Sequence, residues 1–359
     1  MRLYELAEKA FEMEKRRKPL AKLFIGESEL GTPNEITEVA MKALAKGNTR
    51  YSSAAGEFTL REKLAEKHGV TPENIVMTPG SKFAIYSLLN LFVGKGNSAV
   101  AIAPAWPGFM GMANLLGINL KLVKTELENN WRPDPEAVRK EIRQNGAKML
   151  ILNSPNNPTS TCMLPSDLEE IMEIASDEGV FVLSDDAYKE LSFERTEPTR
   201  NHNPKHIVVS SFSKTYSMTG WRVGYLVAEK EICEEAITMN QLTFSCVPSF
   251  VQEGAIAALD LKGEPERRRK IYSERSKMAV KILRRQFELS KPQAGFYIFP
   301  RRKGLDSDKL AQKLVQEGIG VAPGSDFGGY NEFIRISLTL KTEKLEGILE
   351  RIIEVVENE

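Results

Sequence analysis

The chain has 359 residues, 42% of them hydrophobic, which is enough for two domains with sizeable cores. Its 49 Lys and Arg residues balance its 49 Asp and Glu residues, and the resulting net charge of zero argues against general nucleic-acid binding. Three widely spaced cysteines, and no apolar run near the roughly 18 residues of a membrane helix, lead us to expect a cytoplasmic protein that binds neither metal nor membrane.

Charged and apolar residues alternate over residues 1–20, and this spacing predicts an amphipathic helix. From about residue 70 to 240, short apolar runs alternate with helical stretches, for example at 167–178. Such alternation is typical of an α/β fold with a mostly parallel sheet. The predicted strands are Asn74–Met77, Ala99–Ala103, Leu120–Val123, Met149–Leu152, Val180–Leu183, Ile207–Val209 and Val223–Val227.

The pattern changes beyond residue 250, where a long charged amphipathic helix is predicted from about Glu266 to Phe287. Within it, we interpret the basic run Arg267–Lys270 as a face of the helix exposed to solvent. Two short β-like runs, Gly295–Phe299 and Phe333–Ser337, then bracket a helix near Ser307–Glu317. These elements predict a second, smaller domain that begins near the start of the long helix.

Five of the predicted strands are each followed by a polar cluster. Taken singly, the clusters have ordinary structural interpretations: Gly80-Ser81 as a turn and helix cap, Trp106 as core packing, and Lys214 as a surface lysine. However, ligands of open α/β sheets bind at the carboxyl ends of the strands, so the five clusters together predict one site. The clusters are Thr78–Lys82, Pro104–Trp106, Asn153–Thr159, Ser184–Tyr188 and Ser210–Lys214.

The segment Ser211–Gly224, with the sequence SFSKTYSMTGWRVG, resembles the Schiff-base signature of the class I and II aminotransferases. These are pyridoxal 5′-phosphate (PLP) enzymes of fold type I, in which a phosphate-binding arginine follows the lysine by eight residues. Residues 51–61, 323–328 and 334–337 resemble further motifs of the family in the same order. The resemblance runs from about Phe24 to Leu340, which is nearly the whole chain.

This resemblance implies the PLP-transferase fold type I, with a mostly parallel mixed sheet flanked by helices and a smaller α+β domain. It implies a large PLP-binding α/β domain over residues 36–262. The small domain is then expected to combine residues 1–35 with residues 263–359. The family's active sites are shared between two subunits, so a homodimer is expected as well.

The resemblance also implies a role for each candidate residue. Lys214 is expected to form the Schiff base and to move the proton of the substrate Cα, while Asp185 pairs with the pyridine nitrogen and Tyr188 with the ring oxygen O3′. The implied catalytic residues are Lys214, Asp185 and Tyr188. The implied cofactor-binding residues are Gly80, Ser81, Lys82, Trp106, Asn157, Asp185, Tyr188, Ser211, Ser213, Lys214, Arg222 and, from the neighbouring subunit, Tyr51. The implied substrate-binding residues are Arg335, Asn157, Gly26 and Lys82.

The implied reaction is PLP-dependent transfer of an amino group between an amino acid and a 2-oxo acid. Lys82 resembles a lysine with which a subgroup of prokaryotic aspartate aminotransferases binds the distal carboxylate, so aspartate or glutamate is expected as one substrate. Another fold type I reaction such as β-elimination, of the C–S lyase type, remains an alternative, as does a preference for aromatic or other neutral amino acids. A PLP-sensing regulatory domain is a less favoured alternative.

Two segments depart from the family's pattern. Ser160 stands where glycine usually follows the Asn-Pro-Thr motif, and Gly26-Glu27-Ser28-Glu29 replaces the usual Gly-Glu-Pro-Asp. Neither change removes a catalytic group. The departures bear on the substrate-facing N-terminal loop and therefore on the identity of the substrate.

Overall fold

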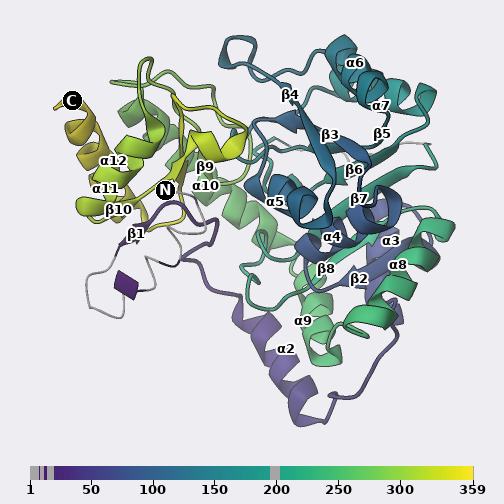
Figure 1. The fold of residues 1–359 in the computed structure, drawn as a ribbon. Helices are drawn as coiled ribbons and strands as arrows, with labels where there is room; N and C mark the ends of the chain where they lie inside the picture. The colour runs from purple at the N-terminus through teal and green to yellow at the C-terminus, as the bar shows by residue number, and fades with distance from the viewer. Residues whose placement is uncertain (1–7, 9–11, 14–19, 195–202, 359) are drawn as a thin grey trace.

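The computed structural model describes residues 8, 12, 13, 20–194 and 203–358. Most of the amphipathic helix predicted over residues 1–20 lies outside the described residues. A seven-stranded sheet forms the centre of the larger part of the molecule (Figure 1). Its strand order is β2-β8-β7-β6-β5-β3-β4; β8 pairs antiparallel with β2 and with β7, and the other pairs are parallel. The strands are β2 (Ile75–Thr78), β3 (Ser98–Ala103), β4 (Asn119–Lys124), β5 (Ala147–Asn153), β6 (Phe181–Asp185), β7 (His206–Ser211) and β8 (Gly224–Val227).

This sheet confirms the predicted fold class, and each predicted strand overlaps an observed one. The central strands are buried on both faces, so they read as continuous apolar runs in the sequence. The edge strand β4 instead exposes Lys121 and Lys124. Charged side chains on an edge strand hinder pairing with other chains, which fits its position at the end of the sheet.

Helices cover both faces of the sheet because alternate strand residues point to opposite sides. On one face, α4, α5 and α8 pack against side chains such as Ile151 and Val209. On the other face, α6 and α7 pack against Leu150 and Val182, and α2, α3 and α9 cover the end near β2 and β8. These helices are α2 (Asn34–Ala45), α3 (Phe58–His68), α4 (Ser81–Phe92), α5 (Pro107–Leu116), α6 (Pro135–Asn145), α7 (Pro165–Asp177), α8 (Lys230–Thr243) and α9 (Ser249–Asp260).

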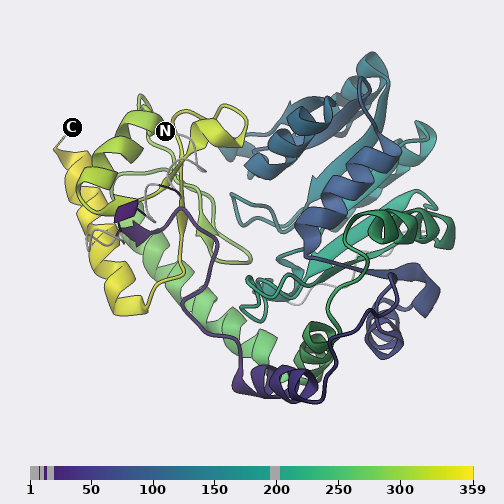
Figure 2. The same ribbon diagram turned by 60° about the horizontal axis from the view of Figure 1, so that its bottom comes forward.

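The C-terminal elements form a second packed unit, on the left in Figure 1. It contains a three-stranded antiparallel sheet and a two-stranded parallel sheet in which β1 (Ala21–Lys22) pairs with β10 (Ile319–Gly320). Figure 2 shows the N-terminal segment running from this unit toward α2. The division of the chain at residues 36 and 263 stays a prediction. The remaining elements are β9 (Tyr297–Ile298), β11 (Ala322–Pro323), β12 (Ile334–Ser337), α10 (Gly263–Leu283), α11 (Ser307–Gln316), α12 (Thr342–Glu357) and the 3-10 turns η1 (Pro72–Asn74), η2 (Leu127–Asn129), η3 (Lys189–Leu191) and η4 (Gly324–Phe327).

The interpretation of Arg267–Lys270 as a solvent-exposed face is wrong for Arg268, whose side chain is fully buried. The buried side chains of α10 recur three or four residues apart, and Arg268 stands on that stripe between Pro265 and Tyr272. Helical periodicity therefore places one arginine of the run against the protein while its neighbours remain at the surface. No helix in the described part of the chain is both long enough and apolar enough to cross a membrane.

We expect Gly224→Ala to destabilise the protein, because β8 begins in close contact with the loop before α4. A Cβ atom at Gly224 would lie 2.7 Å from the backbone nitrogen of Ser81 and 2.8 Å from the carbonyl oxygen of Ser210. Overpacking of this kind costs about 1–3 kcal/mol. Gly220→Ala is the matched control, since its Cβ would meet no atom within 4 Å. Urea unfolding should separate the two variants, and equal midpoints would contradict this account of the contact.

Candidate active site

The carboxyl edge of the seven-stranded sheet gathers the predicted polar clusters. Asn153 ends β5 and donates a hydrogen bond from Nδ2 to the backbone oxygen of Asp185, which ends β6 (2.9 Å). The Oδ1 atom of Asn153 also accepts from the backbone N–H of Asn157 (2.8 Å). One side chain thus holds two clusters in a fixed relation, as expected where parallel strands end side by side.

Asp185 is a buried carboxyl group close to Lys214. Its side chain accepts a hydrogen bond from the backbone N–H of Ala187 at 3.1 Å. Burial raises the pKa of Asp185 to about 6, although that N–H and the charge of Lys214 act in the opposite direction. A cationic ring nitrogen bound at this carboxylate would lower the cost of its burial.

Lys214 follows β7 and points toward the N-terminal segment. Its Nζ atom donates a hydrogen bond to the backbone oxygen of Gly26 at 2.6 Å. Gly26 has no room for a side chain, because a Cβ atom there would lie 1.7 Å from the hydroxyl oxygen of Tyr297. Only glycine lets the chain pass between Tyr297 and the lysine, and this explains why the sequence places it there.

Arg335 lies in β12 and is 2% exposed. Its guanidinium donates to Asn157 Oδ1 (2.8 Å) and to the backbone oxygen of Phe24 (2.5 Å), and it lies over the ring of Tyr297. Within the described residues, its Nε has no hydrogen-bond partner and it forms no ion pair. A buried cation without a counter-ion is costly, so this position suits a carboxylate ligand.

Tyr188 lies between the Asp185 and Arg335 regions. Its hydroxyl group is 3.1 Å from the hydroxyl group of Tyr297, within hydrogen-bonding distance. Burial, followed by the neighbouring Tyr297, raises the pKa of Tyr188 well above its usual value, so the phenol stays protonated and can act as a hydrogen-bond donor.

Gly80 and Arg222 form the opposite end of the site, where α4 begins. Gly80 caps α4 with a φ of +81°, and the Arg222 guanidinium lies 2.4 Å from where a Gly80 Cβ would be. Arg222 donates to the backbone oxygens of Pro79 (3.1 Å) and Thr219 (2.7 Å). A helix N-terminus that begins at Ser81, beside a guanidinium, is a favourable place for a phosphate.

The serine side of this phosphate region is compact. Ser211 and Ser213 are both buried, and the Ser211 hydroxyl accepts a hydrogen bond from the backbone N–H of Ser213 at 3.3 Å. Ser211 ends β7, so the strand delivers both hydroxyl groups to the edge from which Lys214 also projects.

Lys82 and Trp106 lie together beside the phosphate region. The Nζ atom of Lys82 is 5.5 Å from the Trp106 ring centroid, a cation–π distance. Burial, and then the charges of Arg222 and Lys214, lower the pKa of Lys82. This end of the site therefore concentrates three cationic side chains, Lys82, Arg222 and Lys214, which attract anions.

Tyr51 is the predicted residue that the structure does not bring to the site. Its side chain is 86% exposed. Its predicted role in a neighbouring subunit stays a prediction.

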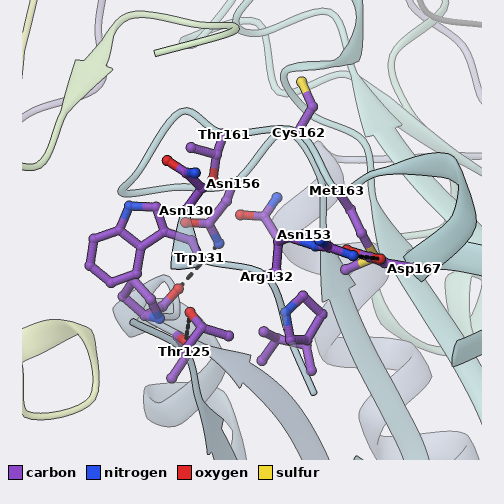
Figure 3. Close-up of a pocket in the computed structure, with 14 residues that line it drawn as sticks. Thr125, Asn130, Trp131, Arg132, Asn153, Asn156, Thr161, Cys162, Met163 and Asp167 are labelled. Carbon is purple, nitrogen blue, oxygen red and sulfur yellow. Dashed lines mark hydrogen bonds and ion pairs between the residues drawn. The ribbon is translucent and has the colours of Figure 1, made fainter. Parts of the chain in front are cut away.

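A pocket beside the 153–161 loop contains none of the predicted site residues (Figure 3). Its polar wall is the double hydrogen bond from Arg132 to Asp167, at 2.7 and 2.9 Å. Asn153 and Asn156 line it on the side that faces the sheet edge. Across the described residues, no three His, Cys, Asp or Glu side chains form a group that could hold a metal ion.

Residues 18–352 match the model of a family described as aminotransferase class I and II. The chain belongs to this family. An aspartate aminotransferase of Thermococcus kodakarensis is 35% identical over 90% of this chain and 86% of its own length. An aromatic-amino-acid aminotransferase of Thermococcus litoralis is 31% identical over 97% of this chain and 94% of its own length. The crystal structure of aspartate aminotransferase from Thermotoga maritima superposes with a TM-score of 0.92 at 27% identity, covering 99% of this chain and 96% of that one.

Sequence reasoning missed one residue that shapes the site of this aminotransferase, Tyr297, and one buried carboxyl group, Asp186, which lines a different pocket with Lys189 and Glu190. Tyr297 contacts Tyr188, Gly26 and Arg335, but it lies in a run that was read only as a strand. Asp186 was read as part of a cluster with no role of its own, yet it is 93% buried, since only 7% of it is exposed. The pair of adjacent aspartates before Ala187 was the sequence feature that could have drawn attention to Asp186. No feature of the sequence distinguished Tyr297.

We expect Asp186→Asn to flatten the dependence of stability on pH. Burial, opposed by Lys189 and reinforced by Asp185, raises the Asp186 pKa from an ordinary 3.8 to about 7. The folded protein binds this proton more tightly than the unfolded chain does. The contribution of Asp186 to the free energy of unfolding is therefore full below about pH 4 and is lost as pH rises through about 7. The melting temperature of the cofactor-free protein should therefore fall less steeply between about pH 5 and 8 for the variant than for the unmodified protein. Equal slopes would contradict the raised pKa.

Proposed function

We propose that this aminotransferase binds PLP at Lys214 and transfers amino groups between aspartate or glutamate and 2-oxo acids. The observation that carries the proposal is the conjunction of the Lys214 amine, the buried Asp185 carboxyl group and the buried Arg335 guanidinium without a counter-ion. The names of the relatives support both the reaction and the substrate.

The donor set fits PLP at each part of the cofactor. Asp185 suits the ring nitrogen because its buried carboxylate lacks a cationic hydrogen-bond partner among the described residues. Asn157 uses its Oδ1 atom on Arg335, which leaves its Nδ2 amide to donate to the ring oxygen beside Tyr188. The cofactor-binding role of Trp106 would be to cover the ring. Gly80, Ser81, Ser211, Ser213 and Arg222 would hold the phosphate.

When bound, PLP draws electrons from the substrate Cα and so makes its proton removable. Lys214 is the group placed to take that proton and to return it, once its amine is released from the cofactor. Arg335, whose Nε has no hydrogen-bond partner among the described residues, would bind the α-carboxylate and so would orient the Cα–H bond toward the lysine.

The dicarboxylate assignment rests on Lys82. Its pKa is lowered by burial and by two neighbouring cations, so an additional carboxylate there would relieve the repulsion. Gly26, at the other wall, would limit the room around the substrate because Tyr297 lies directly behind it.

A homodimer in the cytoplasm completes the proposal. The exposed Tyr51 side chain is available to reach the phosphate of a second copy. Cys162, Cys233 and Cys246 are all unpaired, as expected in a reducing compartment.

Borohydride reduction of the PLP-saturated protein should attach the cofactor to Lys214. The Lys214→Ala variant should still bind PLP. Its catalytic rate should fall by more than the roughly 10²–10⁴-fold expected for removal of a general acid–base, because the variant also loses the covalent anchor of the cofactor. Peptide mapping of the reduced protein is the measurement, with unreduced protein as the control. A label on another lysine would refute the cofactor assignment.

Lys82→Gln should reduce kcat/KM for aspartate or glutamate by roughly 10- to 150-fold, because a hydrogen bond to a charged group contributes about 1.5–3 kcal/mol. Activity on an amino acid without a second carboxylate should change little. Kinetics with both donor classes, together with PLP titration, give the comparison. If kcat/KM fell equally for both classes of donor, or if only the affinity for PLP fell, Lys82 would be a cofactor-binding residue.

The aromatic relative supports a second candidate, transamination of aromatic amino acids. A panel of donors and 2-oxo acceptors with added PLP distinguishes it from the first. The same assays detect β-elimination, since that reaction releases ammonia and pyruvate instead of forming a new amino acid.

A further inference from the structure

Residues 26–32, here called the N-terminal strap, are bound on one side to the loop between Lys214 and Arg222. Gly26 accepts a hydrogen bond from Lys214, and Thr32 Oγ1 donates to the backbone oxygen of Ser217 at 2.8 Å. Glu27 accepts from Thr219 Oγ1 at 2.5 Å. The strap therefore follows the loop that carries the Schiff-base lysine at one end and the predicted phosphate-binding arginine at the other.

The other side of the strap is bound to α10. Tyr272 donates its hydroxyl hydrogen to Ser28 Oγ at 2.5 Å. Arg275 forms a two-point ion pair with Glu29, with N–O distances of 2.5 and 3.1 Å. The backbone N–H of Glu29 also donates to the backbone oxygen of Thr339 at 3.1 Å, so the middle of the strap is fixed both by α10 and by the segment after β12.

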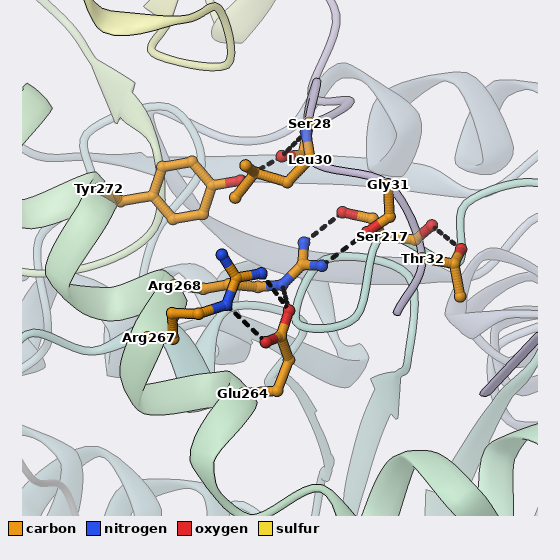
Figure 4. Close-up of polar contacts among 9 residues, drawn as sticks. All are labelled: Ser28, Leu30, Gly31, Thr32, Ser217, Glu264, Arg267, Arg268 and Tyr272. Carbon is orange, nitrogen blue, oxygen red and sulfur yellow. Dashed lines mark hydrogen bonds and ion pairs between the residues drawn. The ribbon is translucent and has the colours of Figure 1, made fainter. Parts of the chain in front are cut away.

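Arg268 is the side chain that contacts α10, the strap and the loop at once (Figure 4). Its NH2 group donates to the backbone oxygen of Gly31 at 2.8 Å, and its NH1 group donates to Ser217 Oγ. Its Nε donates to Glu264 Oε1 at 2.6 Å, one turn earlier on the same helix. Each nitrogen of the guanidinium thus binds a different partner.

The surroundings of Arg268 make this junction strong. The side chain is fully buried, and Glu264, 11% exposed, supplies its counter-charge. Hydrogen bonds from an ionised donor in a low-dielectric site are stronger than neutral ones. An ammonium group is a single point charge, so a lysine at this position could not span three acceptors in the directions that the planar guanidinium fixes.

We propose that Arg268 is a positioning residue for the amino-transfer reaction. By joining Gly31 to Ser217, it fixes the strap against the Lys214 loop. The near end of the N-terminal segment then presents the Gly26 carbonyl to Lys214 and the Phe24 carbonyl to Arg335. Arg268 touches neither substrate nor cofactor and acts only through this geometry. Its catalytic consequence rests on the proposed function, but the contacts of the junction are all made within the chain.

The test is Arg268→Met, which keeps a long apolar stem and removes all three donors. Amide hydrogen exchange of the cofactor-free protein should become at least about tenfold faster in peptides covering residues 23–32 and 212–223. Peptides from α12, which shares no hydrogen bond with Arg268, should exchange as in the unmodified protein. In the PLP-loaded enzyme, KM for the amino donor should rise about tenfold, with a smaller change in kcat, because Arg335 loses a fixed neighbour.

Arg267→Met is the matched control. Arg267 binds the same Glu264 through two hydrogen bonds of 2.7 Å, but it is 52% exposed and contacts neither Gly31 nor Ser217. Its exchange pattern and KM should stay within about twofold of the unmodified protein. Arg268→Lys should give exchange rates and a KM between those of the unmodified protein and Arg268→Met, because the lysine retains the charge and one contact.

Unchanged exchange in residues 23–32 of Arg268→Met would overturn the proposal, as would an equal effect of Arg267→Met. If Arg268→Met does not fold, Ser217→Ala replaces it, since it removes only the hydroxyl acceptor. It should accelerate exchange in the same two peptides by a smaller factor, and no acceleration would be equally decisive. A protein with no transaminase activity would refute the proposed function while leaving the exchange result intact.

Discussion

Burial of charged and ionisable groups at the carboxyl edge of the sheet is the constraint on which the site depends. Asp185 and Arg335 are both at least nine-tenths buried, and neither forms an ion pair with a side chain of the described chain. Such groups are stable only where the surrounding structure holds them in place and a ligand can complete them. Two sheets provide that support: Asn153 fixes the end of β6 in the seven-stranded sheet, and β12 of the three-stranded sheet carries Arg335.

The N-terminal segment joins these two units at the point where they supply the reacting groups. Within a few residues it gives a carbonyl to Arg335, gives another to Lys214, and passes the hydroxyl of Tyr297 with no space for a side chain. Its conformation therefore helps to place the Lys214 amine and the Arg335 guanidinium. That explains why the departures of Gly26–Glu29 from the family's pattern leave the contacts in place: Ser28 binds Tyr272, and Glu29 binds Arg275.

The fold could be predicted from the sequence because its strands are apolar runs and its helices have clear periodicity; β6 and α10 both appear near their predicted positions. The clusters of the candidate site could also be located, because a parallel sheet brings its strand ends together. Tyr297 and Arg268 could not be identified. Their roles depend on contacts between segments more than 50 residues apart, such as Arg268 with Ser217 (separation 51), and composition favours a solvent-exposed reading of a basic run.

The charge distribution of the site also bears on substrate choice. Burial, and then the charges of Arg222 and Lys214, lower the pKa of Lys82, while Asp185 is a buried carboxyl group close enough to Lys214 for the lysine's charge to oppose the rise that burial causes in the Asp185 pKa. A bound phosphate would compensate Arg222 and the start of α4, and covalent attachment of the cofactor would use the Lys214 amine. Lys82 then remains as a cation beside Trp106 without an assigned anion. A second carboxylate on the substrate would satisfy it, whereas an aromatic side chain would have to accept its charge through the ring face, a weaker interaction when the ammonium remains partly solvated.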